Sequence, residues 1–107
     1  MKKAILLLAA AALIAMVAGA TLFAADVEAG KAVLKTQKCS MCHSIAGVGG
    51  KLNALDEAGK LKADDIKKWI RTPKSMKADT KMTAYSAEKL SDKDLDDLVA
   101  YLSTLKK

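Results

Sequence analysis

The pentapeptide Cys39-Ser40-Met41-Cys42-His43 constrains this chain most, because it holds both cysteines and the single histidine of the 107 residues. Two cysteines separated by two residues and followed at once by a histidine are the pattern of c-type haem attachment. At this spacing each sulfur reaches one vinyl group along a haem edge, and the histidine offers a nitrogen to the iron. We therefore expect one haem c, held by thioethers from Cys39 and Cys42, with His43 as an axial ligand.

Two other kinds of site use similar residues. A redox dithiol of the C-x-x-C kind follows a strand in a βαβ pattern, and no segment of this chain alternates apolar and polar residues as a strand would. A structural zinc site takes four Cys or His ligands, whereas the chain has two cysteines and one histidine. The zinc site therefore lacks ligands, and a redox dithiol or a fortuitous pattern remains the alternative to haem.

Residues 1–25 have the composition of an export signal. Met1-Lys2-Lys3 is basic, and no charged residue follows until Asp26, which matches the basic and apolar regions of a secretory leader. The uncharged stretch would be about 33 Å long as a helix, enough to cross a hydrocarbon core of about 30 Å. Residues 1–25 are therefore either a signal peptide or an uncleaved N-terminal membrane anchor.

The cleavage point is not fixed by the sequence. Ala18-Gly19-Ala20 fits the small-x-small rule, whereas a cut after Ala25 would place the bulky Phe23 at the third position before it. In either case the domain of residues 26–107 is predicted to be exported to the periplasm, and held at the outer side of the inner membrane if the leader is retained.

The exported part predicts an all-α domain. Asp26 can cap a helix from about Val27 to Lys38, and a second helix from about Ala63 to Arg71 ends before Pro73. The last helix is expected to begin after Ser91, with Asp94 three residues on, and to end at Lys106 and Lys107, whose charges suit a helix C-terminus. Its predicted buried stripe has helical spacing and consists of Leu95, Leu98, Val99, Leu102 and Leu105.

Two segments predict loops. Residues 44–60 contain four glycines that interrupt any periodic pattern, with a short helical piece expected around residues 53–58. Residues 74–89 are polar and irregular and contain Met76 and Met82.

Over residues 26–107 the chain resembles class I c-type cytochromes. The matching pieces occur in the family's order: Gly30-Lys31-Ala32-Val33-Leu34, Cys39 to His43, Trp69-Ile70-Arg71-Thr72-Pro73-Lys74-Ser75-Met76, Lys81-Met82-Thr83-Ala84-Tyr85 and Leu98-Val99-Ala100-Tyr101-Leu102. The resemblance implies a cytochrome c-like fold of three to four helices around one covalently attached haem.

The resemblance also implies particular contacts. The first and last helices cross near the haem edge, where Gly30 lacks a Cβ and permits close approach and Tyr101 packs beside it. Trp69 lies against the haem and directs its indole N–H toward a propionate. Plain core packing is the alternative role for both aromatic residues.

The sixth iron ligand has to come from something other than histidine, because His43 is the single histidine. A methionine sulfur, a lysine or an open position remain. Met82 lies in the segment that resembles the family's distal-ligand loop, so we expect Met82 as the ligand. Met76, near Pro73, is expected to be core or rim packing.

Two residues depart from the family. Thr83 follows Met82 where proline is common. Ala54 stands where another proline is common, whose carbonyl accepts the hydrogen bond from the histidine ring. Both loops lose a residue that restricts the unfolded chain, which predicts a more labile Met82 ligand.

A His/Met-ligated iron has no open position for substrate, so we expect a one-electron carrier without catalytic residues rather than an enzyme. The alternative is a haem-based sensor or a peroxidase-like enzyme in which the distal position is labile or open. The chain offers no second histidine for such an enzyme.

Charge indicates the partner. The chain carries a net charge of +6, and residues 31–81 hold 12 basic against 5 acidic side chains. Lys38 and Lys81 flank the motif and the expected ligand, so they could steer encounter with the acidic docking face of a redox protein. Simple solubilising charge is the alternative. We expect a monomer that binds no nucleic acid, and that meets the membrane only if the leader is retained.

Overall fold

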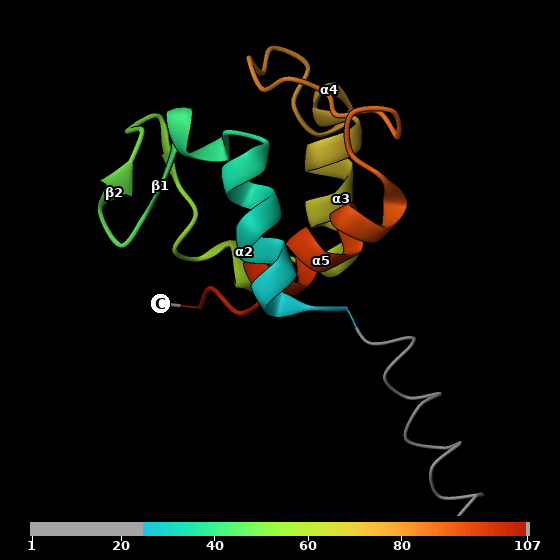
Figure 1. Ribbon diagram of the computed structural model, residues 1–107. Helices are drawn as coiled ribbons and strands as arrows, with labels where there is room; N and C mark the ends of the chain where they lie inside the picture. The colour runs from blue at the N-terminus through green and yellow to red at the C-terminus, as the bar shows by residue number, and fades with distance from the viewer. Residues whose placement is uncertain (1–24, 107) are drawn as a thin grey trace, which may run out of the picture.

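The structure is a computed structural model that describes residues 25–106. It contains the α-helices α2 (Val27–Thr36), α3 (Ala63–Arg71), α4 (Pro73–Met76) and α5 (Asp92–Ser103). In Figure 1 a small sheet lies on one side of α2, and α3 and α4 lie on the other. Apart from Ala25, the predicted leader is outside the described residues. Within residues 25–106, no helix has the length and apolar character needed to cross a membrane.

The helices begin where their capping residues predict. The Asp26 carboxylate accepts hydrogen bonds from the backbone N–H groups of Glu28 and Ala29, and the Ser91 hydroxyl accepts one from Asp94. These bonds satisfy donors that the first turn of a helix leaves without partners. The starts of α2 and α5 are thus fixed by local sequence.

Helix α2 ends two residues earlier than the sequence predicts. It stops at Thr36, and Lys38 adopts a left-handed conformation with φ 58°. That conformation is unfavourable for a residue with a side chain, and helices that end in it usually carry glycine there. Because lysine stands at this position, the sequence gives no signal for the helix end. The turn at Lys38 redirects the chain into the Cys39–His43 motif.

Helices α2 and α5 cross at Gly30, as the resemblance implies. A Cβ at position 30 would collide with the carbonyl oxygen of Asp97, and it would lie 2.8 Å from the Cβ of Tyr101. The absence of a side chain at Gly30 therefore sets the distance between the two helix backbones.

The core lies between α2, α3 and α5. Helix α5 ends at Ser103, earlier than the predicted end at Lys106 and Lys107. Four members of the predicted stripe are buried, whereas Leu105 lies beyond the helix and is only half-buried. Each buried aliphatic side chain contributes roughly 1.5–3 kcal/mol relative to exposure. The full core is Leu34, Ile66, Ile70, Leu90, Leu95, Leu98, Val99 and Leu102.

The all-α prediction is wrong. About half of the described residues are helical, and a three-stranded sheet follows the motif in the order β2-β1-β3. Strand β1 (His43–Ile45) pairs antiparallel with β2 (Val48–Gly49) and parallel with β3 (Asn53–Ala54). Strands this short cannot show an alternating pattern, so the sequence carried no periodic signal for them.

The hairpin turn explains further why the sheet was missed. Ala46 and Gly47 form the two-residue loop between β1 and β2, with φ of 52° and 80°. Such turns usually carry Asn-Gly or Asp-Gly, whereas here the carboxylate of Asp56, ten residues away, accepts a hydrogen bond from the Ala46 N–H. Asp56, which supports the turn, thus lies outside the turn sequence itself.

Two local predictions are also wrong. The helical piece expected around residues 53–58 is instead β3 followed by a 3₁₀ turn, η2 (Ala58–Lys60). The segment 74–89, expected to be irregular, begins within α4. Pro73 is the first residue of α4, a position where its missing N–H costs nothing.

Candidate functional site

The Cys39–His43 motif lies directly after α2 and before the sheet. Cys39, Ser40 and Met41 form one 3₁₀ turn, η1 (Cys39–Met41), and His43 begins β1. A redox dithiol is expected after a strand, whereas here a helix precedes the motif. The order of elements argues against the dithiol alternative.

The protonation of Cys39 argues the same way. Burial raises the pKa of the Cys39 thiol above its ordinary value, and the side chain packs against the core. Reactive dithiols have lowered pKa values because the thiolate is the nucleophile. Both cysteines are free thiols, with Cys39 half-buried and Cys42 exposed.

The ring of His43 is oriented by the sheet. Its Nδ1 lies 3.1 Å from the carbonyl oxygen of Asn53, and β1 and β3 pair these two residues in register. A carbonyl can only accept, so Nδ1 carries the proton and donates it. In the neutral imidazole this leaves the lone pair on Nε2, which is the tautomer that a metal-ligating histidine requires.

The acceptor is one residue earlier than expected. The resemblance implied the carbonyl of Ala54, whereas the structure uses that of Asn53. The parallel register pairs Ala54 with Ser44 instead, and a prediction made without the sheet could not include this register.

The two candidate methionines differ in burial. Met82 is half-buried and packs against the core, whereas Met76, at the end of α4, is 36% exposed. Met82 also lines a cavity of about 290 Å³ that includes residues from the end of α3 and from α4. The structure thus gives Met82 an inward-facing environment and Met76 a surface one.

Trp69 is half-buried on α3, next to the buried Ile70. Among the described residues, the packed core does not include Trp69. Core packing of the kind made by Ile66 and Ile70 therefore does not account for its position.

The segment that carries Met82 is tied to Gln37, which lies between α2 and the motif. The hydroxyl of Tyr85 donates to the carbonyl of Gln37 at 3.3 Å, and the Gln37 side-chain amide donates to the carbonyl of Lys89 at 3.0 Å. Burial raises the pKa of Tyr85, and the nearby Cys39 and Cys42 raise it further. Residues 85–89 are thus held beside the motif, a contact that sequence analysis missed because Gln37 and Tyr85 have no distinctive spacing.

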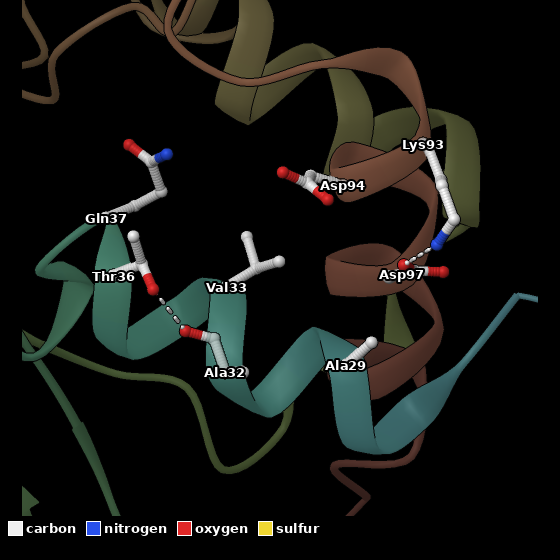
Figure 2. Close-up of a pocket in the computed structure, with 8 residues that line it drawn as sticks. All are labelled: Ala29, Ala32, Val33, Thr36, Gln37, Lys93, Asp94 and Asp97. Carbon is white, nitrogen blue, oxygen red and sulfur yellow. Dashed lines mark hydrogen bonds and ion pairs between the residues drawn. The ribbon is translucent and has the colours of Figure 1, made fainter.

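A second cavity, of about 270 Å³, lies between α2 and α5 and is lined by none of the motif residues. Figure 2 shows Lys93 reaching Asp97 at the edge of this cavity. The Asp97 carboxylate accepts from the Asp26 backbone N–H at 2.9 Å and from Lys93 at 2.8 Å. These bonds, first Asp26 and then Lys93, hold the pKa of Asp97 below its ordinary value. This cavity belongs to the helix crossing.

The donor set fits haem better than zinc. Within residues 25–106 no three His, Cys, Asp or Glu side chains gather as metal ligands would, which leaves a structural zinc site without its ligands. Two free thiols followed at once by one imidazole are instead the groups that attach a c-type haem and supply one of its axial ligands.

Comparison with known proteins gives an independent assignment. Residues 25–102 match the family model described as cytochrome C oxidase, cbb3-type, subunit III. Cytochrome c oxidase subunit 2 of Alkalihalophilus pseudofirmus is 33% identical over 89 residues, which is 72% of this chain and 25% of that protein. The chain thus spans about a quarter of the length of this relative. No solved structure matches the chain significantly.

Proposed function

The chain belongs to the cytochrome c family of that model, and from this premise we propose that it is a one-electron carrier with a single haem whose axial ligands are His43 and Met82. Membership of the family implies a covalently bound haem c and haem-based electron transfer. The haem iron supplies the exchange of one electron, and the chain's own residues attach it, orient it and exclude other chemistry.

The observation that carries this proposal is the hydrogen bond from His43 Nδ1 to the Asn53 carbonyl. It supports His43 as the proximal ligand, because it fixes the ring and leaves Nε2 for the iron. Cys39 and Cys42, two free thiols on the same turn of chain, would form the two thioethers. The raised pKa of Cys39 counts against thiol redox exchange.

Met82 is supported as the distal ligand by its burial and by the anchoring of its segment. It packs against the core, and Tyr85, three residues on, bonds to Gln37 just before the motif. The Met82 thioether is thus carried by an anchored segment and packs against apolar side chains. Both features suit a sixth ligand, and a methionine ligand raises the reduction potential. With both axial positions filled, the iron would have no open position for a substrate or ligand. A sensor or peroxidase-like enzyme needs such a position.

Trp69 is proposed to pack against the haem. Its half-buried position outside the core cluster leaves ring surface that an apolar macrocycle could cover.

The partner is proposed to be a redox protein with an acidic docking face. Lys38 and Lys81 are both exposed and flank the motif and Met82. The relative's name, cytochrome c oxidase subunit 2, supports an oxidase complex as the destination of the electron. The domain is proposed to act outside the cytoplasm, with residues 1–25 as an export signal or anchor.

Electrophoresis and a redox titration test the function. The exported protein should keep its haem stain after denaturation. Cys39→Ala and Cys42→Ala should each leave one thioether, and the denatured variants should retain less haem. A potentiometric titration should follow a one-electron curve, with low-spin spectra in both oxidation states. A high-spin oxidised spectrum together with rapid peroxide turnover would instead support the sensor or enzyme alternative.

A further inference from the structure

The segment between α4 and α5 contains no regular helix or strand in residues 77–91. Its geometry therefore depends on bonds to other elements. The Met82 backbone N–H is bonded locally, to the Thr80 hydroxyl at 3.3 Å. The next anchor along the chain is Tyr85, whose N–H donates to the carbonyl of Ile70 at 2.9 Å.

Arg71, the last residue of α3, makes more of these bonds than any other described side chain. Its Nη1 donates to the carbonyl oxygens of Tyr85 at 3.0 Å and Leu90 at 2.6 Å, and its Nη2 donates to the Asp92 carboxylate at 2.9 Å. One guanidinium thus connects the end of α3 to both ends of the segment 85–90 and to the start of α5.

These bonds differ in strength. The Arg71 side chain is 21% exposed and that of Asp92 is 91% exposed, so the ion pair with Asp92 is largely screened by water. The two bonds to backbone carbonyls are charge-assisted and part-buried, whereas the bond to Asp92 is exposed. The carbonyl bonds, rather than the ion pair, should hold the segment.

Arg71 and Met82 also line the same cavity of about 290 Å³. We propose that Arg71 is the positioning residue for Met82: by holding Tyr85 and Leu90 against α3, it keeps the Met82 thioether at the iron. This inference rests on the proposed function, in which Met82 is the distal ligand. Lysine cannot replace arginine here, because one ammonium lacks the planar set of donors that reaches two carbonyls at fixed angles.

The test measures how readily imidazole displaces the Met82 sulfur from the oxidised iron of the full-length haem-loaded protein. Displacement requires the sulfur–iron bond to open, so its rate reports the lability of the segment. Because charge-assisted bonds to the segment are lost, Arg71→Gln should bind imidazole at least ~10-fold faster than the wild type, which corresponds to about 1.4 kcal/mol. Arg71→Lys should resemble Arg71→Gln, and Asp92→Asn should resemble the wild type.

A second measurement separates positioning from general stability. In Arg71→Gln and Arg71→Lys the sulfur-to-iron charge-transfer band should be lost at lower denaturant than the far-ultraviolet circular dichroism of the helices. Coincident transitions, or imidazole rates equal to those of Asp92→Asn, would overturn the positioning role. If Arg71→Gln does not fold, Arg71→Lys decides the question. Persistence of the band in Met82→Ala would instead overturn the ligand assignment itself.

Discussion

The backbone of Gly30 lies directly against the carbonyl group of Asp97 where α2 crosses α5. The same residue of α5 sends its carboxylate to the N-terminus of α2, where it accepts the Asp26 N–H. Asp97 therefore contacts α2 through both its backbone and its side chain. The crossing can be tested at each of these contacts.

Gly30→Ala should destabilise the haem-loaded protein by about 2 kcal/mol, because the new methyl group meets backbone atoms that cannot rotate away. Chemical denaturation followed by circular dichroism measures the effect. Ala32→Ser, at an exposed position of the same helix, should change stability by less than about 0.5 kcal/mol. Equal stability of Gly30→Ala and the wild type would show that the helices separate at little cost.

Asp97→Asn should lower stability at pH 7 by about 1–2 kcal/mol, since a buried charge-assisted acceptor is lost. The fold lowers the pKa of Asp97, so the wild-type advantage should be complete above the unfolded-state value of about 3.9. It should then diminish as the pH falls through the lower folded-state pKa. Denaturation of both proteins between pH 7 and pH 2 measures this difference.

Asp96→Asn is the matched control for Asp97→Asn. Asp96 is on the same helix but 54% exposed, in an ion pair with Lys67 at 3.0 Å, and such pairs contribute about 0–1 kcal/mol. A pH-independent difference between Asp97→Asn and the wild type would contradict the role assigned to the Asp97 charge.

Met82→Ala should abolish the sulfur-to-iron charge-transfer band of the oxidised protein and lower its reduction potential, because a thioether ligand favours the reduced iron. Met76→Ala should preserve both, since Met76 lies at the surface. Absorption spectra and potentiometric titration of the two variants are the measurements. The opposite pair of results would assign the ligand to Met76.

Lys38→Gln with Lys81→Gln should slow oxidation by an acidic redox partner at low salt while leaving the potential unchanged, because exposed rim charges act on encounter. Raising the ionic strength beyond 0.1 M, where the Debye length is about 10 Å, should remove the difference. Lys106→Gln, another exposed lysine, is the control in stopped-flow experiments. A wild-type rate independent of salt would exclude lysine steering.

The sequence predicted α2, α3 and α5, though not α4, because the signals of those three helices are local. Asp26, Ser91 and the spacing of Ile66 and Ile70 each specify an element within a few residues of themselves, and α3 has the predicted bounds. The sheet depends instead on a turn supported from Asp56, and α2 stops at a left-handed lysine. No local pattern contains such information.

The candidate site likewise has features that the sequence could predict and features that it could not. The motif residues and Met82 could be proposed from residue type and order. The bonds that orient them could not, because they use main-chain atoms of Asn53, Gln37, Tyr85 and Leu90 as acceptors. Every residue offers a carbonyl, so residue identity does not distinguish the one that is used.

The bond from His43 to Asn53 therefore has a consequence for how this protein can change over evolutionary time. The acceptor is a peptide oxygen whose place depends on the pairing of β1 and β3, and the Asn53 side chain is exposed. Under the proposed ligation by His43, most substitutions at position 53 would leave unchanged the electron density that the imidazole gives the iron. Mutations that shift the strand register would alter it even when both proposed ligands are retained.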